Sequence, residues 1–208
     1  MLFLAILAIF FICIVIHEYA HGLVASWLGD NTAKYSGRLT LNPLAHIDLF
    51  GTILLPLFLL ITAVITKSNP VIFGWAKPVP VNYRGLKNPK RDIIWVGLAG
   101  PAVNILAAVI LSIILKTNLL LPLWAGYLVK QAIITNLILA VFNLMPIPPL
   151  DGSRVLIGLL PEPLASTYAK LERYGLIILI GLMYLSPRFF DFVLSIVSRL
   201  LNLLNIQI

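Results

Sequence analysis

Residues 16–22 read Ile16-His17-Glu18-Tyr19-Ala20-His21-Gly22, and they lie near the end of an apolar run that begins at residue 1. On an α-helix the four-residue spacing puts His17 and His21 on one face, about 6 Å apart, where both imidazoles can reach one ion. This is the geometry of a pair of zinc ligands. Glu18 lies about 100° round the same turn, where its carboxylate can reach a water at the metal without binding the metal itself. Glu18 is therefore the candidate general base.

A buried histidine is often only a hydrogen-bonded core residue, so this alternative has to be weighed. Apart from Cys13 and Tyr19, residues 1–29 hold three ionisable side chains, and all three lie in this one turn. A carboxylate at membrane depth costs at least about 2.5 kcal/mol unless it is paired or hydrated, so ionisable residues there are functional by default. The clustering favours a metal site.

The composition is that of a membrane protein: 60% of the 208 residues are hydrophobic and 11% are charged. A soluble domain of this size needs more polar residues to cover its surface. The 15 Lys and Arg against 8 Asp and Glu would suggest nucleic acid in a soluble chain, but here the basic residues lie between apolar runs. That pattern sets orientation in a membrane. We expect a multi-pass protein in the lipid bilayer of the cell membrane, with no nucleic-acid partner.

The predicted fold is an all-α polytopic membrane protein, a single domain over residues 1–208, with about five to six membrane helices. A small β element is also expected, because residues 37–41 alternate like a short strand and residues 73–82 carry prolines at alternate positions, as an edge strand does. The expected helical segments are 1–28, 49–66, 93–115, 124–152 and 165–208. In the last of these a polar stripe predicts an embedded helix turned toward its neighbours.

The helix over 93–115 carries Gly97, Gly100, Asn104 and Ala108 on one face, which permits close helix approach. A packing seam without a chemical role is the favoured interpretation. Elsewhere His46 is a possible third zinc ligand, but a histidine beside the Asn42-Pro43 turn is as often a hydrogen-bonding residue that orders a loop, and we favour that role.

The helix that begins near residue 124 runs into a proline-rich bend at residues 143–152, Asn143-Leu144-Met145-Pro146-Ile147-Pro148-Pro149-Leu150-Asp151-Gly152. The prolines end the helix and free backbone groups, which is tolerated at the membrane only inside protein or beside a hydrated cavity. Asp151 just beyond the bend is an acceptable third zinc ligand. A surface helix N-cap is an equally good interpretation on the residues alone.

With both polar sites in view, the chain resembles the site-2 protease family of intramembrane zinc metalloproteases. His17-Glu18-x-x-His21 is similar to the first family motif, and Asn143-x-x-Pro146 followed by Leu150-Asp151-Gly152 to the second. Ala99-Gly100-Pro101-x-x-Asn104 on the intervening span is also similar to the family. Two further stretches, Asn42-Pro43-x-x-His46 and Gly74-Trp75-Ala76-Lys77-Pro78, are similar to the compact bacterial and archaeal branch without a PDZ or CBS module.

The resemblance implies one Zn²⁺ per chain, bound by His17, His21 and Asp151, with Glu18 as the catalytic acid and base. It also implies that Asn143 lies beside the metal and positions substrate or stabilises the oxyanion. The implied activity is zinc-dependent endopeptidase cleavage within or next to transmembrane segments, with a transmembrane protein or peptide as substrate.

Two other functions are alternatives to an endopeptidase. An inactive metal-binding scaffold, or pseudoprotease, would be expected to have lost Glu18 or a ligand. A metal transporter would be expected to carry a chain of acids across the remaining spans. The sequence has neither feature.

The resemblance also implies an active site toward the cytosolic face, with residues 30–48 in the cytosol. The loop over residues 67–92 carries six Lys and Arg residues, and such a basic short loop is expected to be cytosolic too. Both ends of segment 49–66 would then lie on one side of the membrane, which a single crossing does not permit. Its modest length and Pro56 favour a re-entrant segment.

Overall fold

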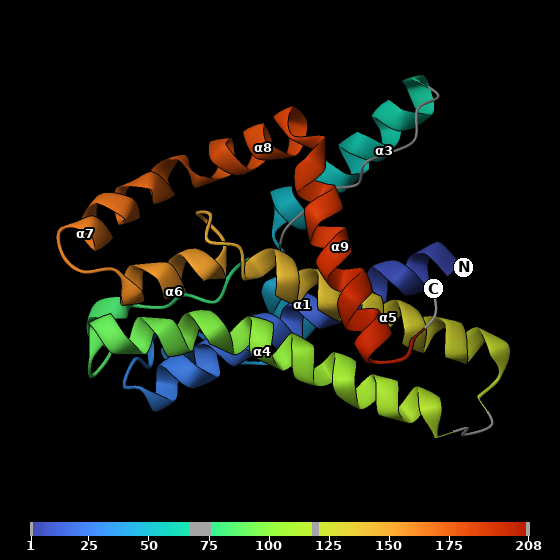
Figure 1. Ribbon diagram of the computed structural model, residues 1–208, viewed down its shortest axis with the longest axis horizontal. Helices are drawn as coiled ribbons and strands as arrows, with labels where there is room; N and C mark the ends of the chain where they lie inside the picture. Colours follow the sequence, from blue (N-terminus) through green and yellow to red (C-terminus); the bar gives the residue numbers. More distant parts are fainter. Residues whose placement is uncertain (1, 67–75, 118–120, 207–208) are drawn as a thin grey trace.

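The computed structural model describes residues 2–66, 76–117 and 121–206 (Figure 1). Every regular element in these ranges is helical, as the apolar runs predict. The α-helices are α1 (Leu2–Trp27), α2 (Thr32–Tyr35), α3 (Leu55–Thr66), α4 (Pro89–Lys116), α5 (Leu123–Asn143), α6 (Asp151–Leu159), α7 (Leu164–Ala169), α8 (Gly175–Leu185) and α9 (Pro187–Leu203). Short 3-10 helices are η1 (Pro43–His46), η3 (Tyr83–Gly85) and η4 (Lys170–Tyr174), and η2 (Leu49–Leu54) is a π-helix.

The centre of the fold is α4, which packs against α1, α5 and α6 (Figure 1). By length and composition, four stretches in the described ranges are able to cross a membrane: Leu4–Trp27, Leu49–Thr66, Pro89–Lys116 and Leu123–Asn143. The protein is thus a multi-pass membrane protein with fewer candidate spans than the predicted five to six. The C-terminal segment accounts for the difference. Its two longest helices, α8 with 11 residues and α9 with 17, measure only about 17 and 26 Å against a hydrocarbon layer of about 30 Å.

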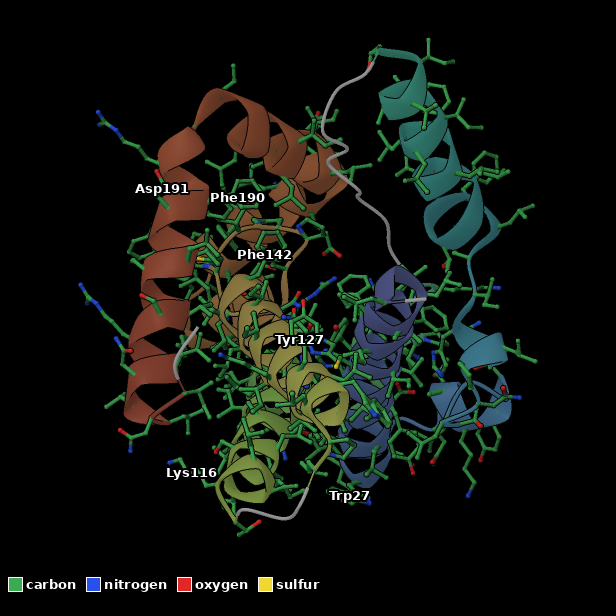
Figure 2. All side chains as sticks on the ribbon, turned by 90° about the vertical axis from the view of Figure 1, so that its right-hand side faces the viewer. Trp27, Lys116, Tyr127, Phe142, Phe190 and Asp191 are labelled. Carbon is green, nitrogen blue, oxygen red and sulfur yellow. The ribbon has the colours of Figure 1, made fainter. Side chains whose placement is uncertain are left out.

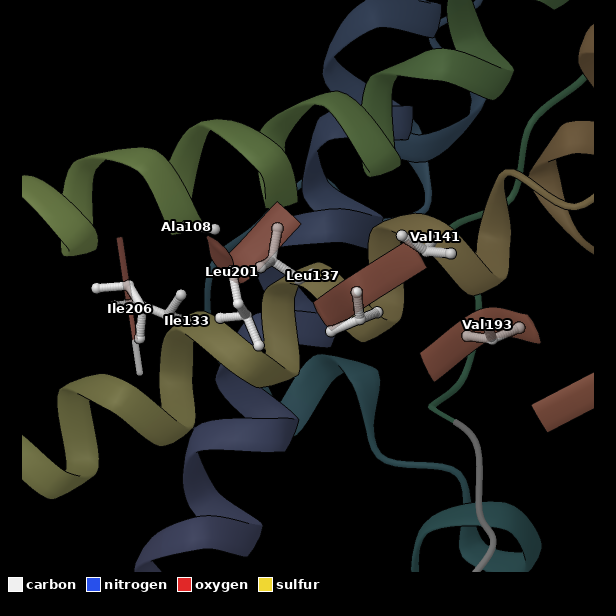
Figure 3. Packing of buried hydrophobic residues seen from close by; sticks show 8 residues of the cluster. Ala108, Ile133, Leu137, Val141, Val193, Leu201 and Ile206 are labelled. Atoms are coloured by element: carbon white, nitrogen blue, oxygen red, sulfur yellow. The ribbon is translucent and has the colours of Figure 1, made fainter. Parts of the chain in front are cut away.

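Helix α9 packs its apolar side on the bundle. Val193, Val197 and Leu201 are buried against residues of α4 and α5, among them Ile133 and Leu137 (Figure 3). The polar stripe of α9 lies on the other side, where Asp191, Ser195, Asn202 and Asn205 are exposed. Figure 2 shows Asp191 on this side. The prediction that this stripe faces neighbouring helices was therefore wrong. An amphipathic helix gains more by burying its apolar side.

The predicted β element is absent from the described residues, since neither 37–41 nor 76–82 forms a strand. The reason lies in where the backbone donors go. Val79 N–H donates to Glu18 Oε2 at 2.8 Å, and Asn82 N–H donates to Asp30 Oδ2 at 2.7 Å. Pro78 and Pro80 have no N–H to offer. Side-chain carboxylates thus take the place of a partner strand along this extended segment.

The carbonyl groups of the same segment are also held by a side chain. One guanidinium nitrogen of Arg38, Nη2, lies 2.7 Å from the Lys77 carbonyl oxygen and 3.3 Å from that of Pro78. Residues near positions 38 and 79 therefore do lie close together, as the prediction of paired strands required, but through side-chain contacts. Residues 73–75 of the predicted strand lie outside the described ranges.

Segment 49–66 is one continuous helical stretch, η2 followed by α3, and α3 stands away from the other helices (Figure 1). Large apolar side chains along it, such as Leu57, Phe58 and Val64, are exposed. Beyond it, Lys77 N–H donates to the His46 carbonyl oxygen at 2.9 Å, so the chain comes back at residue 77 to the point that it left at residue 46. The path between 67 and 75 lies outside the described ranges. The position of this segment in a membrane stays a prediction.

The bend between α5 and α6 brings the second polar site back to the bundle. The predicted helix over 124–152 ends at Asn143, and a new helix begins at Asp151. Gly152 permits this close turn, since a Cβ there would lie 2.2 Å from the Leu144 carbonyl oxygen. Gly97 on α4 faces the start of α6 in the same way, since a Cβ there would lie 3.1 Å from the Asp151 carbonyl oxygen. These contacts place Asp151 beside α1.

Candidate metal centre

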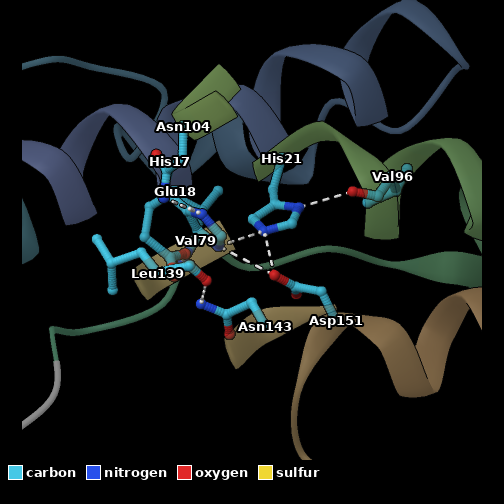
Figure 4. Close-up of polar contacts among 9 residues, drawn as sticks. All are labelled: His17, Glu18, His21, Val79, Val96, Asn104, Leu139, Asn143 and Asp151. Carbon is cyan, nitrogen blue, oxygen red and sulfur yellow. Dashed lines mark hydrogen bonds and ion pairs between the residues drawn. The ribbon is translucent and has the colours of Figure 1, made fainter. Parts of the chain in front are cut away.

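Three side chains from α1 and α6 converge on one point (Figure 4). His17 Nε2 lies 3.0 Å from His21 Nε2, and Asp151 Oδ2 lies 3.0 Å from the first and 3.2 Å from the second. Both histidines are buried. Among the described residues, this is the one group of three His, Cys, Asp or Glu side chains whose ligand atoms gather closely enough for a metal ion.

The donor set and its spacing fit zinc. A tetrahedral zinc ion with bonds of about 2.05 Å to nitrogen and oxygen holds its ligand atoms about 3.3 Å apart, close to the three distances here. Two imidazoles and one carboxylate leave a fourth position open, as catalytic zinc sites do. Gly100 on α4 keeps the neighbouring space clear, because a Cβ there would lie 2.4 Å from His21 Nε2 and 2.5 Å from His17 Nε2.

The far side of each histidine ring is in contact with α4. His21 Nδ1 donates to the Val96 carbonyl oxygen at 2.7 Å, which leaves the Nε2 lone pair directed at the other ligand atoms. His17 Nδ1 lies 3.2 Å from the side-chain amide of Asn104. The face of α4 that was interpreted as a packing seam therefore also touches the site.

Asp151 is the first residue of α6, and no side-chain cap bond is made at this helix start. The N-cap interpretation of this residue is thus wrong, since the carboxylate points to the histidines instead. Its Oδ2 lies 3.0 Å from His17 Nε2 and 3.2 Å from His21 Nε2, where an ionised carboxylate would serve as the third ligand.

Glu18 lies beside this cluster but outside it. Its Oε2 accepts a hydrogen bond from Val79 N–H, and its side chain lines the same cavity as the two histidines (Figure 4). This matches the position predicted from the helix, on the same turn but about 100° round from the first histidine. A carboxylate there can reach a water at the metal.

The two remaining candidates from the sequence differ in their placement. Asn143, at the end of α5, lines the cavity, and one N–H of its amide donates to the Leu139 carbonyl oxygen at 3.0 Å. His46 is fully buried, and its Nε2 lies 2.8 Å from the Thr40 carbonyl oxygen. It does not belong to the ligand cluster, in line with the loop-ordering role that the sequence favoured.

The site opens into a cavity of about 320 Å³. Sequence reasoning missed two residues that line this cavity, Tyr83 and Arg154. The guanidinium of Arg154 lies 5.0 Å above the ring of Tyr83 and forms an ion pair with Glu172. Arg154 is three residues after Asp151 on one helix, which is the signal that was available. The cavity is lined by His17, Glu18, His21, Pro78, Val79, Val81, Tyr83, Val96, Asn143, Pro149, Asp151 and Arg154.

Comparison with known proteins agrees with this geometry. The family model described as "Peptidase family M50" matches residues 5–123 and 123–186. The chain belongs to peptidase family M50. This confirms the resemblance to the site-2 proteases. No solved structure matches the chain.

The M50 relatives carry names that point the same way. "Putative zinc metalloprotease YwhC" of Bacillus subtilis (strain 168) is 37% identical over 179 residues, which cover 82% of this chain and 75% of that protein. "Putative zinc metalloprotease Rip2" of Mycobacterium tuberculosis (strain H37Rv) is 26% identical over 210 residues, 99% of this chain and 76% of that protein. Rip2 of Mycolicibacterium smegmatis is 26% identical over 185 residues, 87% and 67% respectively. M50 membership and these names support a zinc metalloprotease, with Zn²⁺ as its cofactor.

Proposed function

We propose that this M50 protein is an intramembrane endopeptidase that hydrolyses peptide bonds within or next to transmembrane segments of membrane proteins. The observation that carries the proposal is the triangle of His17 Nε2, His21 Nε2 and Asp151 Oδ2, with sides of 3.0, 3.0 and 3.2 Å, built on a helix long and apolar enough to span the membrane. A protease site on such a helix meets substrates at the membrane. No described contact favours a scaffold or a transporter.

In this proposal His17, His21 and Asp151 hold one zinc ion. When zinc is bound, it supplies Lewis acidity to a water and to the scissile carbonyl group. Glu18 takes the proton from the attacking water and returns it to the leaving amine. Tyr83 and Asn143 line the cavity, and each has an N–H or O–H to offer to the substrate backbone. Burial raises the pKa of Tyr83, so its hydroxyl stays a donor.

The extended segment over residues 76–82 is the proposed docking edge for the substrate backbone. Val79 and Val81 line the cavity, and their backbone groups face one edge, while the prolines at 78 and 80 leave the other edge without donors. Because Glu18 already holds the Val79 N–H, the Val79 carbonyl group and the backbone of Val81 are the groups proposed to pair with the substrate. A substrate helix hides its carbonyl groups in its own hydrogen bonds, so it must unwind before it is cut. The unwound stretch can then pair with this edge by strand addition.

We also propose that the site faces the cytosol. Residues 77–91 carry five basic side chains, and this stretch lies at the same end of the bundle as Glu18, through the Val79 contact. Basic short loops stay on the cytosolic side. Because residues 46 and 77 meet, the two described ends on either side of segment 49–66 and residues 67–75 would lie on that side.

Cysteine labelling tests this orientation. In a Cys13→Ser background, single cysteines at Ser36, Asn88 and Asn118 are treated in intact cells with a membrane-impermeant thiol reagent. We expect positions 36 and 88 to be protected and position 118 to be labelled. Labelling at 88 with protection at 36 would mean that the segment crosses the membrane and that the orientation argument fails.

The catalytic proposal is tested with Glu18→Gln. This change removes the base but keeps all three ligands, so the purified variant should keep zinc and lose about 10²- to 10⁴-fold in the cleavage rate of a reconstituted transmembrane substrate. The matched control is Glu162→Gln, an exposed carboxylate far along the chain, which should cleave like the wild type. Undiminished cleavage by Glu18→Gln would refute the mechanism.

A further inference from the structure

Each histidine of the metal centre presents its second ring nitrogen to α4. Histidine ligands usually donate that N–H to an acceptor, which fixes the tautomer and directs the other lone pair at the metal. For His21 the acceptor is the Val96 carbonyl oxygen, 2.7 Å from Nδ1. For His17 the group in the same place is the side-chain amide of Asn104, 3.2 Å from Nδ1.

Asn104 lies in an unusual environment for an amide. Its side chain is fully buried, and within the described part of the chain its Oδ1 has no hydrogen-bond partner. It follows Gly100 by one helical turn, on the face of α4 that touches the ligand atoms. A buried polar atom without a partner is rare and calls for an explanation.

The orientation of the amide decides which nitrogen of His17 carries the proton. If the amide nitrogen faces His17, Nδ1 must accept, and the ring proton lies on Nε2, the atom that faces His21 and Asp151. A zinc ligand needs the lone pair at that position. If the amide is turned by 180°, Oδ1 accepts from Nδ1–H and the Nε2 lone pair is free. The same turn gives the buried oxygen its partner.

We propose that Asn104 is the positioning residue for the first zinc ligand: its Oδ1 accepts a hydrogen bond from His17 Nδ1–H and so directs the Nε2 lone pair toward the metal. This inference rests on the proposed ligand set. Helix α4 then supplies an acceptor to each histidine, a backbone carbonyl to one and a side-chain amide to the other. Asn104 itself touches neither zinc nor substrate.

The test measures zinc affinity of the purified full-length protein by competition with a chromophoric chelator, and the visible absorption of the Co²⁺-loaded form as a report on ligand geometry. Asn104→Leu keeps the volume but removes every polar atom, and Asn104→Ala serves as a second variant without an acceptor. Asn104→Asp keeps an acceptor and has no donor. The matched control is Asn136→Leu, because Asn136 is a buried asparagine on α5 that bonds to Cys13 Sγ and the Ala132 carbonyl oxygen.

We expect Asn104→Leu and Asn104→Ala to weaken zinc binding about 10- to 100-fold, the usual effect of losing such a partner. Asn104→Asp should stay close to the wild-type affinity and Co²⁺ spectrum, and Asn136→Leu should be unchanged in both. Wild-type affinity in Asn104→Leu would overturn the inference. So would an equal loss in Asn104→Asp, which would point to a donor or packing role. A wild-type protein that binds zinc no better than His17→Ala would instead overturn the ligand set itself.

Discussion

Buried histidines occur in two regions of the molecule, at His17 and His21 on α1 and at His46, and their surroundings differ. His17 and His21 stand one helical turn apart on α1, and their Nε2 atoms meet each other and a carboxylate from another helix. His46 lies in a 3-10 turn, and its Nε2 faces the carbonyl oxygen of Thr40, six residues earlier. Its own carbonyl oxygen accepts from the Lys77 amide. Burial is common to both regions, so burial alone does not mark a ligand.

The difference is in what faces the ring nitrogens. In the first region a second histidine and an acid occupy the Nε2 side while α4 occupies the Nδ1 side, which is the arrangement that metal sites need. In the second region a backbone carbonyl uses one nitrogen, and the ring holds a loop in place. A spacing of four residues on a helix makes the first arrangement possible, and a histidine in a loop has no such partner in register.

Among the variants that test the difference between the two histidine regions, Asp151→Ala should have the largest effect. It removes the only carboxylate of the cluster, so zinc content should fall from about one per chain to near zero, and cleavage should be lost with it. Metal analysis of the purified variant checks this. Asp191→Ala, on the exposed side of α9, should keep both zinc and activity. Full zinc content in Asp151→Ala would remove this residue from the ligand set.

Gly100→Ala should have the next largest effect. Its Cβ would lie within 2.5 Å of ligand nitrogens on both histidines, and relieving such overpacking costs about 1–3 kcal/mol, or about 5- to 150-fold in zinc affinity. Gly126→Ala on α5 is the control, since its Cβ would meet a Leu115 methyl group only at 4.0 Å. Chelator competition on the two variants measures the difference. Equal affinities would mean that α4 does not confine the metal position.

His46→Ala tests the structural role of the second region. It should leave zinc content unchanged but destabilise the fold by about 1–3 kcal/mol, because it removes a fully buried side chain and its contact with the partly buried Thr40 carbonyl group. Thermal unfolding in detergent and metal analysis of one preparation give both values. Loss of zinc with unchanged unfolding would reverse the roles of the two regions.

Much of the helical frame was predictable from the sequence. The expected segments 1–28 and 93–115 correspond to α1 (Leu2–Trp27) and α4 (Pro89–Lys116). Helix α4 begins four residues before the predicted start, because its first turn is charged and so falls outside any apolar window. In that turn the Asp92 carboxylate accepts a hydrogen bond from the Asn88 backbone N–H. The convergence of Asp151 on the histidine turn was expected from the family motifs, whereas its residues alone left a helix cap equally open.

What escaped prediction depends on contacts between distant segments. The strand at 37–41 was inferred from alternation and the one at 73–82 from prolines at alternate positions. In the described part of the second, Glu18 and Asp30 take the donors that a ladder would use. Asn104 was interpreted as part of a packing seam because periodicity places it on a helix face without saying what that face meets. The orientation of α9 was wrongly predicted for the same reason, since the spacing of its polar residues does not show which side of the helix packs against the bundle.

Zinc-edge X-ray absorption of the purified wild-type protein tests the ligand set most directly. We expect a first shell of nitrogen and oxygen atoms at about 2.0–2.2 Å, with outer-shell scattering from two imidazole rings and no sulfur. Scattering from three imidazoles would bring His46 into the site. A sulfur atom at about 2.3 Å would bring in Cys13, and either result would contradict a centre built from His17, His21 and Asp151.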